Sequence, residues 1–577
     1  MGAVINVGNV TLNANVYVNF ASAASTYATG GLVRTITTGS GALLDFQTQT
    51  ISTAAGTGLI KNGDGVLALG GGAYNGGFTL NAGTVIARAV DAFGANASNV
   101  LTLNGGTVAS DATRSFANTK HGGGIVIGGN IQFGELATVL SIASSSANLS
   151  FANNVSLGNA TRTLTQGNNG TNTFSGIIAN TSGGITFAAN VATDGRFELT
   201  NTANTFTGDI NITGGEVRFT ADASLGNAAN DIIIDGGRFA TGSGVTYTLG
   251  GGRQISIGDG VGTSISTPGA GTLTYNGVLA DKTSEVGSWA KQGGGTLALG
   301  GANTYTGSTS VNNGILRLTT GNNRLPTGTV FSLGQAASAN VGTLDLNGFN
   351  QEVAGLSSTA GTNATANRNT VTSIAAATLT VNTTGTYTYS AGTAANSGNI
   401  SGAISFVKSG AGTQILGGSN AYTGTTTIEA GRLLIGGQLT ATAFTQVSSG
   451  GAIGGNGTIA SSLDFASGAK FVFSLTDTLK VNGSSVSFGG FSIADLLGLN
   501  NAVANGTYSL IGGSAVTSLT NVSNVGLINA ASIGGDKTAY FQGAGLQVVV
   551  VPEPSTALSI VIGAGALLGL RRKRRNA

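Results

Sequence analysis

Short runs of alternating apolar and polar residues recur along most of the chain, and glycine and asparagine separate them. The stretches LTLNGGTV at residues 101–108 and IIIDGGRF at residues 232–239 are two examples. Alternation with a period of two is typical of strands that bury one face, and Asn-Gly and Gly-Gly are turn signals. The pattern therefore predicts many short β-strands joined by tight turns.

One unit recurs clearly at three places. It opens with a lysine before a Gly-rich turn, continues to an aromatic residue two positions before a glycine, and reaches a second glycine nine residues after the aromatic. The lysines are Lys61, Lys291 and Lys408, the aromatics are Tyr74, Tyr305 and Tyr422, and the second glycines are Gly83, Gly314 and Gly431. A fourth copy lacks the lysine but keeps the spacing of nine from Phe206 to Gly215. We expect each set to occupy one equivalent position of a repeated coil.

One such unit cannot bury its own apolar face, whereas stacked units can. Parallel stacking also lets the main-chain groups of each coil pair with those of the coils above and below. The prediction is an all-β fold, with a right-handed parallel β-helix over residues 1–440 and a C-terminal β cap over residues 441–550. With roughly 22 residues and about 4.8 Å per coil, about 20 coils would make a rod on the order of 100 Å long.

The order Gly-x-Gly-Thr-Leu-x-Leu, Asn-x-Tyr-Thr-Gly and Asn-x-Gly resembles the autotransporter-associated β-strand repeat of bacterial passenger domains. Its clearest copy runs from Lys291 to Gly314. Each copy of the resemblance covers about 30 residues. The resemblance implies an exported protein of a bacterial cell surface.

Composition fits a packed repeat protein. Glycine supplies 97 of the 577 residues without a Gly-X-Y period, which excludes collagen, and 41% apolar residues with four prolines argue against a disordered linker. Cysteine is absent, so disulfides and thiolate metal sites are excluded. The formal net charge is +2, but five positive charges lie at residues 571–575, and the rest of the chain carries −3. This distribution does not support nucleic-acid binding.

The C-terminal tail, residues 551–577, has three parts. They are the motif Val551, Pro552, Glu553, Pro554 and Ser555, the apolar run 556–570, and the basic cluster Arg571, Arg572, Lys573, Arg574 and Arg575. This order resembles the PEP-CTERM sorting signal, which implies processing by an exosortase-type enzyme. The apolar run predicts one short hydrophobic helix, shorter than the roughly 20 residues of a comfortable membrane span. The basic cluster would keep the C-terminus in the cytoplasm and leave the body outside.

The expected route is export, an inner-membrane intermediate held by residues 556–570, and then the cell surface or extracellular matrix. At the other end, residues 1–7 have neither a basic start nor the apolar stretch of a secretory signal. Because the β pattern begins at once, we expect the sequence to start within a longer chain.

Few residues could carry catalysis. His121 is the only histidine, which leaves little material for histidine-paired nucleophiles or multi-histidine metal sites. The carboxylates that a β-helical glycosidase or lyase would use are scattered, and they are Asp64, Asp194, Asp209, Glu216, Asp231 and Asp235. The turn at residues 62–65 resembles part of a calcium loop but lacks its repeated aspartates and its bidentate glutamate. We expect solvated turn residues, no metal and no cofactor.

Two questions stay open at this point. Tyr74, Tyr305 and Tyr422 either pack against a turn or form a ladder that stacks on sugars. The leading function is a non-enzymatic structural or adhesive surface protein, with exopolysaccharide or another surface polymer as a partner. The alternatives are a β-helical polysaccharide-degrading enzyme and an autotransporter-type passenger that lacks its barrel.

Overall fold

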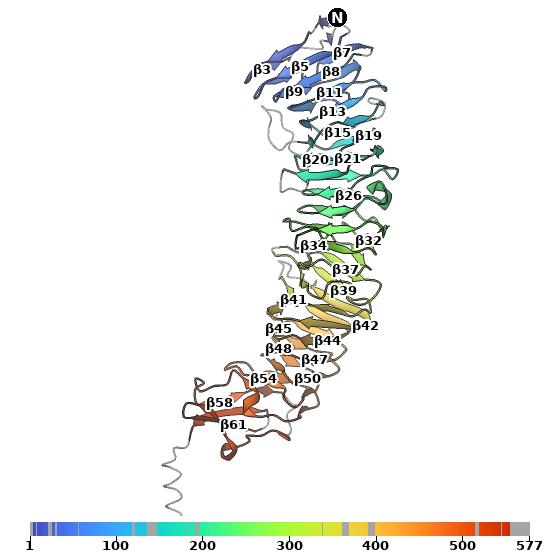
Figure 1. The fold of residues 1–577 in the computed structure, drawn as a ribbon. Helices are drawn as coiled ribbons and strands as arrows, with labels where there is room; N and C mark the ends of the chain where they lie inside the picture. Colours follow the sequence, from blue (N-terminus) through green and yellow to red (C-terminus); the bar gives the residue numbers. More distant parts are fainter. Residues whose placement is uncertain are drawn as a thin grey trace, which may run out of the picture. The chain divides into compact units, whose positions relative to one another are not determined.

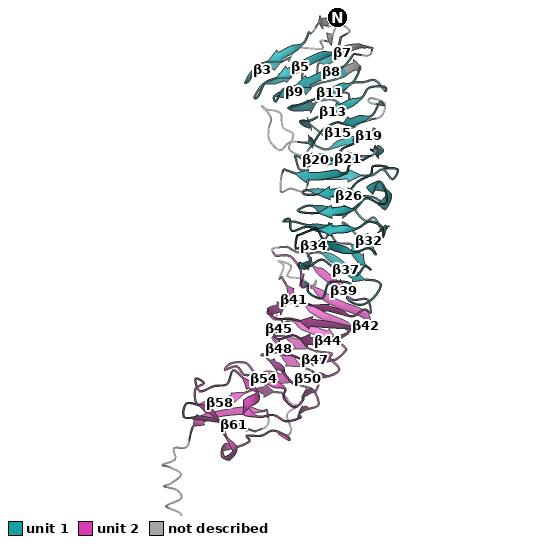
Figure 2. Cartoon of the chain, viewed as in Figure 1, with its two compact units in different colours: residues 1–329 teal, residues 330–577 magenta. Residues whose placement is uncertain are grey.

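The chain divides into two compact units, Met1–Thr329 and Val330–Ala577 (Figure 2). The structure, a computed structural model, describes residues 4–6, 8–20, 26–28, 32–55, 57–117, 122–134, 147–180, 182–190, 195–336, 338–359, 369–390, 398–513, 519–543 and 545–553.

Parallel pairing between successive coils builds the first unit (Figure 1). Strand β8 (Leu59–Asn62) pairs in parallel with β5 (Arg34–Thr38) on one side and with β11 (Phe78–Leu80) on the other. Strand β34 (Trp289–Gln292) lies in the same way between β31 (Ser264–Ser266) and β36 (Thr309–Val311). The predicted parallel β-solenoid is confirmed.

The core forms because in-register pairing places like residues above one another. Ile210, Ile232 and Ile255 align on consecutive coils, and all three are buried. Phe116, Phe151 and Phe174 make a second ladder, with ring centroids 5.3 and 5.4 Å apart. Such stacking lets units with little apolar surface of their own exclude water together.

The second unit continues parallel coils well beyond residue 440, where the sequence predicted the β-helix to end. Strand β44 (Asn399–Ser409) pairs with β42 (Thr370–Asn382) and with β47 (Thr426–Ile428), all in parallel. Among the described strands, the last parallel pair joins β55 (Leu479–Val481) to β59 (Ile511–Gly512). The coils persist because alternating apolar residues and turn glycines continue through this stretch.

An antiparallel sheet follows the last coils. Its strands stand in the order β58-β62-β61-β60, and they are β58 (Gly506–Ser509), β60 (Ala531–Gly534), β61 (Lys537–Gln542) and β62 (Gln547–Pro552). Helical structure in the described part of the chain consists of three single turns, η1 (Asp222–Leu225), η2 (Ile493–Asp495) and η3 (Leu527–Asn529).

The short hydrophobic helix predicted over 556–570 lies outside the described residues. Within the described residues, the structure contains no helix with the length and apolar character needed to cross a membrane.

Candidate functional site

The three repeat lysines occupy one equivalent, fully buried position. The amino group of Lys291 donates to the main-chain oxygens of Gly293, Gly295 and Asn313. The other two lysines repeat the arrangement with small shifts in partner, Lys61 donating to Asn62, Gly63 and Ala82, and Lys408 to Ser409, Gly410 and Ala430. All three lysines are 0% exposed. The predicted equivalence is confirmed.

In each copy the third accepting carbonyl belongs to the following coil, 21 or 22 residues away. The ammonium therefore ties two coils together at a corner where the turn leaves carbonyls pointing inward. Burial lowers the pKa of Lys61 and Lys408 to about 8 and that of Lys291 to about 7, and the charge of Asp64 raises the pKa of Lys61 in part.

The second glycine of the unit is required by the same corner. Gly83, Gly215, Gly314 and Gly431 have φ values of 72°, 68°, 75° and 64°, in the left-handed region. A side chain at Gly314 would also collide with the amino group of Lys291 and with main-chain oxygens of the preceding coil. Position and conformation together explain why glycine follows the aromatic by nine residues in all four copies.

The asparagine of the Asn-x-aromatic sequence bridges three coils. The side-chain oxygen of Asn303 accepts from the amide of Leu279 at 2.8 Å, while its nitrogen donates to the oxygen of Arg324 at 2.7 Å. Asn204 and Asn420 make the corresponding pairs, Ile178 with Ser224 and Ile400 with Gln438. This asparagine stands in the recurring order Asn-x-Tyr-Thr-Gly, but its hydrogen bonds to two neighbouring coils were not predicted.

Tyr305 and Tyr422 are equivalent and buried, each with 0% exposure. The hydroxyl of Tyr305 lies 2.6 Å from that of Thr309, and the hydroxyl of Tyr422 lies 2.7 Å from that of Thr426. Packing against a turn is therefore the correct interpretation for these two residues, and they cannot stack on sugars from solvent. Strand β10 (Gly72–Asn75) contains Tyr74, whose side chain lies outside the described residues.

Most of the scattered carboxylates have structural partners. Asp209 and Asp231 each accept from a main-chain amide one coil later, those of Asp231 and Gln254. Glu216 joins a ladder of charges on the neighbouring strands β24 (Arg196–Leu199), β26 (Glu216–Phe219) and β28 (Arg238–Thr241), in which its partners are Arg218 and Arg238. Asp64 is exposed, and Asp194 and His121 lie outside the described residues.

One group of carboxylates in the described residues could approach a cation. Asp235, Asp259 and Glu285 bring single oxygens within 4.8 Å of one another. Lys282 already lies among them and donates to Asp235 and to Glu285, both at 2.5 Å. These bonds raise the pKa of Lys282, and the lysine supplies the positive charge that the group attracts.

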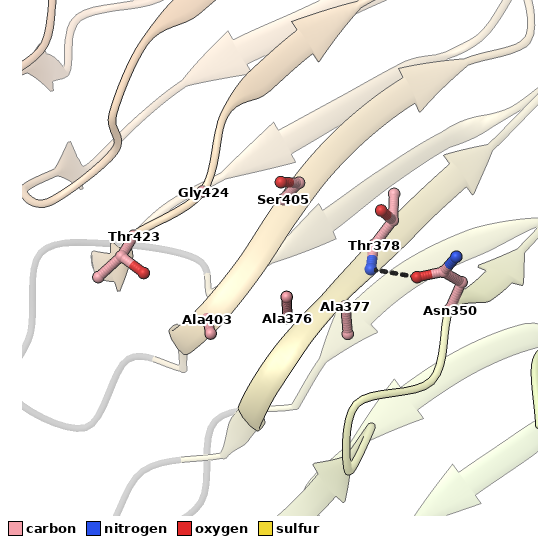
Figure 3. A pocket seen from close by; sticks show the side chains of 8 residues that line it. All are labelled: Asn350, Ala376, Ala377, Thr378, Ala403, Ser405, Thr423 and Gly424. Carbon is pink, nitrogen blue, oxygen red and sulfur yellow. Dashed lines mark hydrogen bonds between the residues drawn. The ribbon is translucent and has the colours of Figure 1, made fainter. Parts of the chain in front are cut away.

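A hollow of about 330 Å³ opens in the second unit where β42 bulges between Ser373 and Ala377 (Figure 3). Its lining residues are small and uncharged, and include Ala376, Thr378, Ser405, Thr423 and Gly424. Asn350 closes one side, and its side-chain oxygen accepts from the amide of Thr378 at 2.8 Å (Figure 3). Among the residues that the structure describes, the lining offers hydroxyl and main-chain groups but no acid or base for chemistry.

The tail motif begins inside the terminal sheet. Val551 pairs with Thr538 and Pro552 pairs with Lys537, so these two motif residues belong to β62. The amide of Glu553 donates to the oxygen of Asp536 at 2.7 Å. Pro554, Ser555 and the basic cluster at 571–575 lie outside the described residues.

Comparisons with known proteins also find the repeated unit in this sequence. The family model described as Passenger-associated-transport-repeat matches residues 59–87, 194–219, 290–318 and 406–435. The chain is 36% identical over 213 residues to the Adhesin BmaC autotransporter of Brucella suis biovar 1 (strain 1330). That match covers 36% of this chain and 5% of the relative. No solved structure matches the chain.

The four matched segments coincide with the three lysine-bearing copies and the fourth copy that contains Phe206 and Gly215. The predicted autotransporter-associated repeat is thus confirmed. The chain carries four passenger-associated-transport repeats within a parallel β-solenoid, and part of it is similar to an autotransporter adhesin.

Proposed function

We propose that this chain is an adhesive, passenger-like protein displayed at a bacterial cell surface, acting through a repetitive solenoid surface rather than through catalysis. The observation that carries the proposal is the similarity to an autotransporter adhesin over 213 residues. The buried lysines, asparagines and tyrosines serve the scaffold, which leaves the outward residues of each coil free to vary with the binding partner. A surface polymer such as exopolysaccharide is the partner class that we propose.

The alternative of a polysaccharide-degrading enzyme finds less support. A glycosidase needs two carboxyl groups flanking one bond, about 5–10 Å apart, with an acid whose pKa is raised. Of the carboxylates that approach each other in this group, those of Asp235 and Glu285 are each engaged by Lys282 and by a main-chain amide. Oxygens that already hold a lysine and main-chain amides in place serve the turn between coils and suit structure better than catalysis.

We further propose that the tail sorts the protein through an exosortase-type enzyme. The order of the motif at 551–555, the apolar run at 556–570 and the basic cluster at 571–575 supports this proposal. The inner membrane would hold the apolar run until the enzyme separates it from the body. Glycines at 563, 565 and 569 weaken a helix in this run, as suits a temporary span.

Attachment assays test the adhesive function. Cells that lack the gene should attach less to a polymer-coated surface than wild-type cells, and the purified solenoid should bind the same polymer reversibly. The enzyme alternative predicts a different result, namely that incubation with the polymer releases new reducing ends. Unchanged attachment together with polymer cleavage would reverse our choice between the two.

A further inference from the structure

We infer that the terminal antiparallel sheet holds the first half of the sorting motif as strand and thereby limits how fast the tail is cut. This inference rests on the proposed sorting function. It concerns residues 551–553, which the structure places in or directly after β62.

Strand β62 is firmly held as far as Val550. It lies between two neighbours, because β58 pairs with it from Ser509 opposite Gln547 to Gly506 opposite Val550, and β61 pairs with its other edge. Val548 and Val550 are both 0% exposed. Releasing this part of the strand would break ladders on both sides and expose buried valines.

The pairing becomes one-sided after Val550. Within the described residues, β58 makes its last pair at Val550, while β61 continues to pair through Val551 and Pro552. Pro552 and Glu553 are exposed, and Val551 is half-buried. Proline has no main-chain donor, so this end of the strand has one hydrogen bond fewer to offer. The last three residues can therefore peel away while the rest of the sheet stays folded.

A processing enzyme needs those residues in another arrangement. Enzymes that cut chains bind the substrate as an extended segment and pair with its main-chain groups, and groups already paired with β61 cannot serve both partners. The cut breaks one peptide bond, whose acyl group passes to water or to an amine while the tail leaves as the free amine. Pro554 and later residues follow the strand, but an enzyme that encloses Val551, Pro552 and Glu553 on both edges requires their release from β61.

The test compares three forms of the full chain in detergent micelles. The first is wild type, the second has Gly-Ser-Gly-Gly-Ser-Gly inserted between Val550 and Val551, and the third has the same insertion in the exposed turn between Leu475 and Thr476. Limited digestion with proteinase K, followed by mass spectrometry, reports which bonds are open. Circular dichroism of each form confirms that the body is folded.

We expect cuts in wild type to begin at Pro554 or later, and cuts among residues 551–553 to be roughly tenfold faster when the insertion precedes Val551. The form with the insertion after Leu475 should be cut among residues 551–553 at the same rate as wild type. Equal rates in all three forms, or rapid cutting among residues 551–553 in wild type, would overturn the inference.

A second measurement separates this inference from the sorting function. In a host that contains an exosortase, a pulse-chase experiment should show faster tail removal when the insertion precedes Val551. If wild type keeps its tail in that host but shows the protected pattern with proteinase K, the sorting function is wrong and the strand-held segment stands. If wild type loses its tail at a rate that the insertion does not increase, sorting stands and the inference is wrong.

Discussion

The amino group of Lys291 and the main-chain oxygen of Asn313 lie 2.9 Å apart, although a full coil separates the two residues in sequence. The next residue, Gly314, turns the chain in the left-handed region beside that amino group. A cation, a carbonyl and a glycine thus define one corner of the solenoid. The same corner recurs at Lys61 and at Lys408.

Replacing Lys291 with methionine should loosen its coil and the following one. The methionine side chain fills space but donates no hydrogen bond, so the carbonyls of Gly293 and Asn313 lose the lysine donor, while that of Gly295 keeps the amide of Ile315. We expect a local loss of about 1–3 kcal/mol, measured as faster hydrogen exchange of amides over residues 289–318. The exposed Lys480 provides the control, since Lys480→Met should leave exchange unchanged.

Stability should rise with pH between about 7 and 9.5. The repeat lysines have pKa values lowered to about 7 or 8 in the folded chain, whereas unfolded lysine titrates near 10.4, so the unfolded state binds more protons in this window. We expect a gain of about 2–3 kcal/mol per lysine in the free energy of unfolding, measured by urea titration.

The rise in stability should end near pH 10. Burial raises the pKa of Tyr305 and Tyr422, so above that pH the folded state binds more protons than the unfolded state, and the free energy of unfolding falls as the pH rises. A variant with Lys61→Met, Lys291→Met and Lys408→Met should lose the rise. An identical rise in that variant would assign the pH dependence to other groups.

Gly314→Ala should destabilise the first unit by about 2 kcal/mol or more, because a Cβ there meets the amino group of Lys291 and strains a positive φ. Gly251→Ala is the matched control, since its Cβ would meet nothing within 4 Å. Thermal unfolding of both variants provides the comparison. Equal melting temperatures would show that the corner tolerates a side chain.

Asn303→Ala should uncouple three coils at once. The change removes the acceptor for the buried amide of Leu279 and one of two donors to the oxygen of Arg324, which keeps the main-chain amide of residue 303 at 3.3 Å. We expect a loss of about 1–3 kcal/mol in the free energy of unfolding. Asn169 is exposed, so Asn169→Ala should change little. Comparable losses in the two variants would contradict the bridging role.

Alternation in the sequence predicted the strands, the parallel stacking and the equivalence of the repeat positions. The same alternation also indicates that the repeat lysines are buried. Leu59, Trp289 and Phe406 each stand two residues before a repeat lysine, and a period of two places both residues on the same, inward face. The lysines are buried because they lie on the same face of the strand as these apolar residues.

Other features depend on contacts that no local pattern encodes. The carbonyl of Asn313 reaches Lys291 only after the next coil has stacked. Arg253 is buried and binds Asp222 and the main-chain oxygens of Asn227 and Asn230, yet its surroundings in sequence are ordinary glycines. The end of parallel pairing was predicted too early, because short alternating strands look alike in parallel coils and in an antiparallel sheet.

The central claim is that the folded chain is displayed at the cell surface after its separation from the tail. The most direct measurement labels whole cells of the native host with an amine-reactive biotin that cannot cross membranes, and determines, by mass spectrometry, the C-terminus of the labelled protein. The account predicts a labelled population that ends before Arg571. A population that the reagent cannot label, or a labelled one that still carries residues 571–575, would contradict it.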